Sequence, residues 1–320
     1  MEMLLQFGLL VVGFLMLIKG ADWFVEGASK IADRFGIPQI VIGLTIVAMG
    51  TSLPEAAVSI SAATKGSADI TIGNVVGSNI MNVLVILGLT SVTRAIAVKK
   101  NTIRYEMPFT IGITVLLAVM GLLDNQVGRI EGAILWVFMI LYLLYLLWIS
   151  KTDKDAIEEV EKAGEKDAIW KMLLMVVVGA ALIVFGSDVT VDAATKIAVG
   201  FGMTERLVGL TIVAFGTSLP ELVTSVTAAI KGKADIAVGN IVGSNIFNIL
   251  FVVGTTALIT PVPYSANFMI DSIVAVAAMV LLLLCVIPKK QLGRVGGILM
   301  LLGYAGYFVY LIQNQNLYLN

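Results

Sequence analysis

The chain has 320 residues, of which 58% are hydrophobic and 13% are charged, and its mean hydropathy is +0.97. A soluble domain carries about 25% charged residues, so there is too little polar side chain here to cover a water-facing surface. The net charge of −1 gives no sign of a nucleic-acid partner, and the absence of histidine removes Ser-His hydrolysis and most zinc catalysis.

Apolar stretches of about 20 residues, the length that crosses a bilayer, recur along the whole chain. We predict an all-α membrane protein with ten transmembrane helices, at 4–27, 37–64, 71–93, 106–123, 129–150, 169–192, 204–230, 237–260, 268–287 and 294–313. The one hydrophilic interruption is the mixed-charge segment 151–167. We interpret it as a linker between a first five-helix unit, 1–150, and a second, 168–320.

Basic residues are concentrated in the linker and in the loops that follow odd-numbered helices, for example at Lys99, Lys100 and Arg104. Cytoplasmic loops carry an excess of Lys and Arg, so we place the linker in the cytoplasm and both termini outside. The expected location is the cell membrane, with the lipid bilayer as partner. A monomer would suffice, because each chain completes its own two-fold site.

The two halves repeat one another at an offset of 166 residues, and no gap is needed to align them. GLTIVA at 43–48 recurs at 209–214, GTSLPE at 50–55 recurs at 216–221, and KGSADITIGNVVGSNIMN at 65–82 returns as KGKADIAVGNIVGSNIFN at 231–248. Each half has five helices, an odd number, so the second copy must enter the membrane from the opposite side. Inverted repeats of this kind place a binding site at mid-membrane, between the copies.

A carboxylate lies deep inside each copy. Glu55 is in the second predicted helix and Glu221 is at the same place in the seventh, with no Lys or Arg near either in sequence. An ionisable group at this depth is costly and by default marks a functional site. Two such carboxylates near the two-fold axis need a cation or shared protons to coexist, and their charges match one divalent ion. The structural alternative is a pair of protonated glutamates that only hold helices together through polar contacts.

A proline stands directly before each glutamate, at Pro54 and Pro220. Proline inside a helix removes a backbone donor and clashes with the preceding turn, so we expect the second and seventh helices to be broken. The carbonyl groups released near Gly50 and Gly216 could then line a cavity, because irregular backbone at this depth is tolerated only where it is buried or faces one. A simple kink is the alternative.

Neutral oxygen donors accompany the glutamates in both copies. Hydroxyl and amide side chains four residues apart share a helix face. We expect eight side chains to be ion ligands: Ser78, Asn82, Ser244 and Asn248, which have this spacing, and Thr51, Ser52, Thr217 and Ser218, which lie within one turn of the glutamates. For Asn74, Asn79, Asn240 and Asn245, ligation and interhelical hydrogen bonding both stay open. A set made only of oxygen ligands selects hard cations such as Ca²⁺ and Na⁺ over zinc, copper or iron.

The doubled motifs GTSLPE and GNxxGSN resemble the two α-repeats of the cation/calcium exchanger superfamily, and they look most like those of prokaryotic sodium/calcium exchangers. The resemblance covers essentially the whole chain. It implies alternating access in which several Na⁺ are exchanged for one Ca²⁺, as transported ions and not as cofactors. By motif position, Glu55 and Glu221 would be the shared carboxylate ligands, joined by the carbonyls of Ala48 and Ala214. The first and sixth helices would move, and the core would stay fixed.

The coupling ion leaves alternatives open. The proton-coupled branch of the superfamily usually has a different sequence around its glutamates, so GTSLPE favours sodium; an H⁺/Ca²⁺ antiporter and a cation channel are the rivals. Potassium-dependent relatives are associated with Asp at one of the paired amide positions, where this chain has Asn82 and Asn248. An enzyme is not expected, because no aspartate pair lies at mid-depth and a serine protease would lack its histidine.

Overall fold

The computed structural model describes residues 2–66, 68, 70–152, 168–201, 214–265 and 267–313. Within these ranges, eight helices are long and apolar enough to cross a membrane, and the bent pair Gln39–Thr51 and Leu53–Thr64 makes a ninth. The seventh predicted span, 204–230, is described only from Ala214 onward, and most of the linker 151–167 lies outside the described residues. The multi-pass helical architecture is therefore confirmed.

The helices follow the predicted spans closely. In the first unit they are α1 (Glu2–Phe35); α2 (Gln39–Ile42), the π-helical η1 (Gly43–Val47), α3 (Ala48–Thr51) and α4 (Leu53–Thr64); α5 (Ile70–Met81), π-helical η2 (Asn82–Leu87) and α6 (Gly88–Thr93); π-helical η3 (Thr102–Glu106) and α7 (Met107–Asp124); and α8 (Arg129–Thr152). The second unit has α10 (Ile169–Gly200); α12 (Ala214–Gly216) and α13 (Leu219–Ile230); α14 (Ala234–Phe247), π-helical η5 (Asn248–Val253) and α15 (Gly254–Ile259); α16 (Asn267–Val286); and α17 (Arg294–Gln313).

Two short antiparallel strand pairs join the units to each other. β1 (Ile96–Ala97) pairs with β4 (Gln291–Leu292), and β2 (Gln126–Val127) pairs with β3 (Val262–Pro263). In each pair one strand comes from each unit, and the repeat carries β1 onto β3 and β2 onto β4. The repeat therefore exchanges the two strand pairs, as a two-fold axis relating inverted units would.

The offset between the units changes along the chain. Gly66 and Gly232, 166 positions apart, both have positive φ, whereas the next such pair, Asn125 and Lys290, is 165 positions apart. The first unit has its extra residue before the fourth helix, where η3 forms a π-helical turn that α16 lacks. Such a turn closes over one more residue than an α-turn. The gapless alignment holds for the first three helices of each unit and is wrong for the last two.

The altered offset brings out a second repeated feature. The Tyr145 hydroxyl donates to the buried Glu106 carboxylate at 2.6 Å, and the Tyr307 hydroxyl donates to the equivalent acid, Asp271, at 2.8 Å, although Tyr307 corresponds to Tyr142 and not to Tyr145. Each bond ties the fourth helix of a unit to its fifth. Sequence reasoning missed both acids, because an alignment at 166 places Glu106 opposite a serine.

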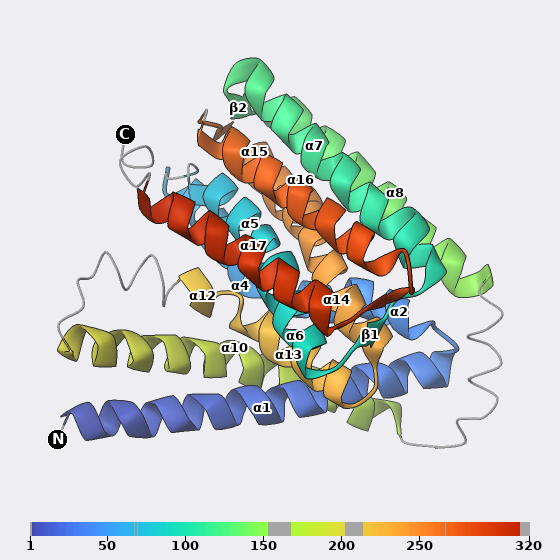
Figure 1. Cartoon of the computed structure of the whole chain (residues 1–320), viewed down its shortest axis with the longest axis vertical. Helices are drawn as coiled ribbons and strands as arrows, with labels where there is room; N and C mark the ends of the chain where they lie inside the picture. Colours follow the sequence, from blue (N-terminus) through green and yellow to red (C-terminus); the bar gives the residue numbers. More distant parts are fainter. Residues whose placement is uncertain are drawn as a thin grey trace.

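The helices separate into a buried core and an outer pair. α14 and its continuation are almost wholly enclosed, whereas α1 and α10 lie side by side and cross the rest of the bundle obliquely (Figure 1). Glycines allow this close contact, because small residues let helix backbones approach. Gly13 faces Gly186, and a methyl group added at Gly20 would lie 2.9 Å from the Gly179 carbonyl oxygen. These two helices are exceptions to the close match with the predicted spans, because each continues eight residues past its expected C-terminal end, α1 to Phe35 and α10 to Gly200.

Candidate ion-binding site

Both glutamates lie just after a break in a membrane helix. The second span bends by 49° around Ser52, which has non-helical dihedral angles (φ −86°, ψ 8°). Ser218 has almost the same conformation (φ −92°, ψ 5°) directly before α13. Proline occupies the first turn of each following half-helix, where its missing N–H costs least. The predicted break in the second helix is confirmed, and Glu55 and Glu221 both fall in the first turn after a break.

The carboxylates are buried and close enough to repel each other. Glu221 Oε1 accepts hydrogen bonds from the hydroxyls of Ser52 at 2.9 Å and Ser244 at 3.5 Å. The Oε2 atom of each glutamate has no hydrogen-bond partner among the described residues. Buried charges are normally paired, so this arrangement needs a cation or protons to be stable.

Four asparagines form a reciprocal network between the two copies. Asn79 Nδ2 donates to the Asn245 carbonyl, and Asn245 Nδ2 donates to the Asn79 carbonyl, both at 3.2 Å. Their Oδ1 atoms accept from Asn248 Nδ2 at 3.1 Å and from Asn82 Nδ2 at 3.0 Å. This fixes the amide orientation: the Oδ1 atoms of Asn82 and Asn248 are left buried and without a hydrogen-bond partner in the described structure.

A second asparagine pair ties each core helix to its broken neighbour. Asn74 Nδ2 donates to the Glu55 carbonyl at 3.2 Å and to Ser59 at 2.9 Å. Asn240 Nδ2 donates to the Glu221 carbonyl at 3.3 Å and to Ser225 at 2.9 Å. For Asn74, Asn79, Asn240 and Asn245, the structure therefore shows interhelical hydrogen bonding, the second of the two alternatives. Their hydrogen bonds hold the backbone at the glutamates and the side chains of Asn82 and Asn248, the two outer asparagines, in place.

The remaining candidates occupy less uniform places. Thr51 donates to Asn240 Oδ1 at 2.9 Å. Ser218 is buried with no hydrogen-bond partner for its hydroxyl in the described structure, whereas Thr217 is half-buried. The Ala48 carbonyl keeps its helical partner, the Ser52 amide at 3.0 Å, and also accepts from Ser244 at 3.4 Å. Ala214 is the first residue of α12, directly beyond a stretch that the structure leaves undescribed.

One regularity of the site could not be seen in the motifs. Asn82 begins η2 and Asn248 begins η5, so both core helices change from α to π geometry at an outer asparagine. Single π-helical turns are rare and occur often at functional sites. Nothing in local composition marks these turns, because both lie in uniformly apolar sequence.

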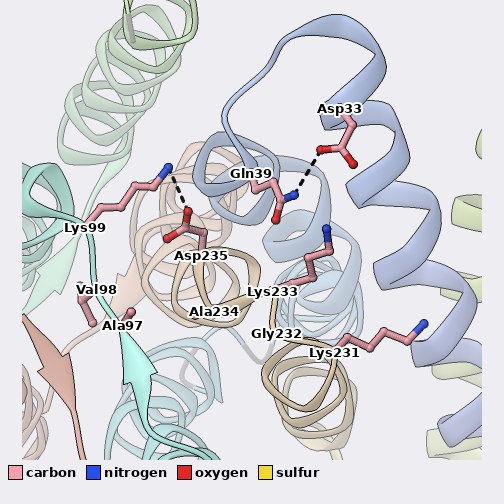
Figure 2. Close-up of a pocket in the computed structure, with 10 residues that line it drawn as sticks. All are labelled: Asp33, Gln39, Ala97, Val98, Lys99, Lys231, Gly232, Lys233, Ala234 and Asp235. Atoms are coloured by element: carbon pink, nitrogen blue, oxygen red, sulfur yellow. Dashed lines mark hydrogen bonds and ion pairs between the residues drawn. The ribbon is translucent and has the colours of Figure 1, made fainter. Parts of the chain in front are cut away.

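No cluster of three or more acidic, cysteine or histidine side chains occurs within the described ranges. Two carboxylates surrounded by neutral oxygens are therefore the whole charged complement of this site. A surface cavity of about 710 Å³ lies elsewhere, between the end of α1 and the loops carrying Lys99 and Lys231 (Figure 2). It is lined by lysines and aspartates that are already hydrogen-bonded or ion-paired in part, so we do not place the ion site there.

Each half of the chain matches the same protein-family model. A model of the sodium/calcium exchanger protein family aligns with residues 5–148 and again with residues 171–313. The chain belongs to this family. The exchanger is 31% identical to the sodium/calcium exchanger MaX1 of Methanosarcina acetivorans, covering 96% of this chain and 98% of that one. It is 41% identical to CaxA of Alkalimonas amylolytica, a provisionally named antiporter, over 93% and 95% of the two chains.

The fold of the exchanger is also that of a solved structure. The sodium-calcium exchanger NCX_Mj, soaked with zero Na⁺ and Ca²⁺, aligns with a TM-score of 0.81 and 32% sequence identity, covering 96% of this chain and 99% of that chain. The ten-helix arrangement with inverted units is consistent with this match. The names of these relatives differ in the ions they specify, and CaxA carries no coupling ion in its name.

Proposed function

We propose that the exchanger moves Ca²⁺ across the membrane in exchange for Na⁺ by alternating access, with both ions using the cluster around Glu55 and Glu221. The observation that carries this proposal is the pair of buried carboxylates whose Oε2 atoms have no partner in the described structure. Two similarities support the choice of ions. One is to the sodium/calcium exchanger MaX1, and the other is to NCX_Mj, whose crystals were soaked with Na⁺ and with Ca²⁺ or Sr²⁺.

The ligands follow from which oxygens are available. Glu55 and Glu221 supply the charge, and the Oδ1 atoms of Asn82 and Asn248 supply two neutral oxygens already oriented by Asn79 and Asn245. Hydroxyls complete the shell. We assign them to Thr51, Ser52, Ser78, Thr217, Ser218 and Ser244, with the carbonyls of Ala48 and Ala214. Ca²⁺ takes six to eight oxygen ligands, fewer than the twelve residues assigned here, so one Ca²⁺ would use only part of the set.

The charge balance explains why the ions would be exchanged and not released. Two buried carboxylates cannot cross between access states uncompensated, because isolated buried charges cost many kcal/mol. One Ca²⁺ or two Na⁺ would neutralise them equally well. Each half-cycle would then proceed only with a neutralised site, and the empty site would stay on the side where it unloaded.

The test is uptake of radioactive Ca²⁺ into Na⁺-loaded vesicles, with the Na⁺, K⁺ and H⁺ gradients varied one at a time. We expect uptake that requires internal Na⁺ and is lost in Glu55→Gln and in Glu221→Gln. Glu131→Gln is the control, because Glu131 caps the Gly128 amide at the membrane edge, away from the cluster. Unchanged uptake in both site variants would refute the proposed site. Uptake driven by an H⁺ gradient alone would show that protons, and not Na⁺, are the coupling ion. Ca²⁺ conduction without a counter-ion would mean that the protein is a channel.

Binding can be measured apart from transport. A ligand that binds only the folded protein raises its melting temperature, so Ca²⁺ should stabilise the purified exchanger in detergent. We expect no Ca²⁺-dependent shift in Glu221→Gln and a normal shift in Glu131→Gln. For topology we retain the arrangement indicated by the basic residues, with the linker in the cytoplasm and both termini outside, in a monomeric unit.

A further inference from the structure

An ion-pair cluster fastens α1 to the core at one face of the molecule. Lys231, directly after α13, lies 2.6 Å from Asp22 Oδ1 and 3.5 Å from Glu26 Oε2, and it also donates to the Asp22 carbonyl at 3.1 Å. Figure 2 shows its side chain extended from the end of α13 toward α1. All three side chains are only partly exposed. Lys231 thus links the second unit's core to the first unit's outer helix.

The repeat contains the same three charges at the opposite face. At the offset of 166, Lys231 corresponds to Lys65, Asp22 to Asp188, and Glu26 to Asp192. Lys65 directly follows α4, as Lys231 follows α13, and the two aspartates lie on α10. Each acid is matched by an acid and the lysine by a lysine.

This second set is not joined in the conformation seen. Lys65, Asp188 and Asp192 are all exposed, and none takes part in an ion pair with another described residue. The helix packing differs in the same way. α1 packs along α13, whereas α10 makes no comparable contact with α4.

We propose that the two triads are alternating ion pairs: Lys231 releases Asp22 and Glu26 in the other access state, and Lys65 then binds Asp188 and Asp192. This rests on the alternating access of the proposed function. In an inverted-repeat transporter, the second state is reached when the two units exchange their conformations around a fixed site. A contact made by one unit in the first state is then made by its counterpart in the second.

The strength of the pairs suits this role. A partly exposed ion pair shifts an equilibrium by about two- to five-fold, because water screens the charges and the side chains lose freedom. One pair on each face balances the other, so neither access state becomes a trap. The nearby Lys99–Asp235 pair, 3.0 Å long, has no lysine at the matching place in the second unit, and we expect it to persist in both states.

The test measures how often Lys65 and Asp188 approach each other. Cysteines replace both residues in a Cys285→Ser background, which removes the only native thiol. A protease site is placed in the linker 151–167. Residue 65 lies in the first unit and residue 188 in the second, so a bifunctional thiol reagent keeps the cleaved halves together on a denaturing gel. The rate of cross-linking then reports the population of the second state.

Lys231→Met should raise this rate by about two- to five-fold, because it frees α1 on the other face. Lys233→Met is the matched control: it removes a lysine two positions away that has no ion pair to α1 in the described structure, and it should leave the rate unchanged. If Lys231→Met elutes abnormally on size exclusion, Lys231→Gln and Asp22→Asn take its place. Both should raise the cross-linking rate by about the same two- to five-fold.

No acceleration, equal acceleration by Lys233→Met, or no cross-link in any variant would each overturn the alternating pairs. The outcome is separable from that of the proposed function, because cross-linking is measured without ion gradients. If the unsubstituted protein showed no Na⁺-driven Ca²⁺ uptake, the exchange reaction would be refuted, but a positive cross-linking result would still hold. Normal uptake with no Lys231 effect would refute only the ion pairs.

Discussion

The two units are alike around the asparagines and unlike around the glutamates. Asn79 and Asn245 make the same pair of bonds at the same 3.2 Å distance. By contrast, Ser52 bonds Glu221 at 2.9 Å, whereas Ser218, its counterpart, has no hydrogen-bond partner for its hydroxyl in the described structure. Symmetry is kept where two core helices meet and lost where the broken helices contribute. A fixed centre with asymmetric flanks is what alternating access requires.

The largest expected effect tests the symmetric centre. Asn245→Ala removes the partner of Asn82 Nδ2 and the side-chain donor to the Asn79 carbonyl, and Asn79→Ala does the same to Asn248 Nδ2 and the Asn245 carbonyl. A buried amide left unpaired costs about 1–3 kcal/mol and the lost bond to the carbonyl about 0.5–1.5 kcal/mol, so both variants should lose about 2–4 kcal/mol of stability. Thermal melting followed by size exclusion would measure it, with Asn101→Ala at the membrane edge as control. Clearly unequal losses would show that the centre is not symmetric in function.

The asymmetric flank gives the next effect. Ser52→Ala removes a hydroxyl bond to a charged carboxylate, worth about 1.5–3 kcal/mol, so Ca²⁺ affinity should fall by roughly 10- to 100-fold in the state seen here. Ser218→Ala removes a hydroxyl that has no protein partner among the described residues and should weaken binding less. Calorimetric titration of the two variants side by side would decide this. Equal losses would mean that both hydroxyls bind the ion and that the observed asymmetry is irrelevant to affinity.

A smaller effect is expected where the outer helices interlock. Gly20→Ala places a methyl group 2.9 Å from the Gly179 carbonyl oxygen, so α1 and α10 must move apart, at a cost of about 1–2 kcal/mol. Gly8→Ala is the matched control on the same helix, because a methyl group there meets nothing within 4 Å. Denaturation midpoints should fall for the first and not for the second. If Gly20→Ala were as stable as Gly8→Ala, the two helices would not be tightly interlocked.

Much of the architecture follows from the chain's own pattern. Hydropathy set the spans, because lipid requires about 20 apolar residues in a row. The proline before each glutamate predicted a break in the second helix, and the structure bends around Ser52. The gapless offset failed beyond the third helix, since an inserted residue held in a π-helical turn leaves hydropathy unchanged. The ends of α1 and α10 were missed because a helix can continue past the apolar stretch that identifies it.

The candidate site was predictable in membership and less so in geometry. Residue type and spacing select Glu55, Glu221 and their oxygen neighbours, because few groups are tolerated at that depth without a reason. Which asparagines bond each other depends on how helices from different units cross. Spacing favoured ion ligation for Asn82 and left Asn79 open, but it could not show that Asn79 bonds a carbonyl across the axis while the Asn82 oxygen has no hydrogen-bond partner among the described residues.

The length of α1 links the exchanger to its lipid surroundings. Its 34 residues extend about 50 Å, well beyond the roughly 30 Å of a bilayer's hydrocarbon core, and α10 is nearly as long. A helix longer than the hydrocarbon core can tilt within the bilayer, and in Figure 1 both helices run obliquely to the others. Any movement of this inclined pair along its own axis changes how much apolar surface the lipid must cover. We therefore expect the turnover rate to depend on bilayer thickness, and so on the chain length of the surrounding lipids.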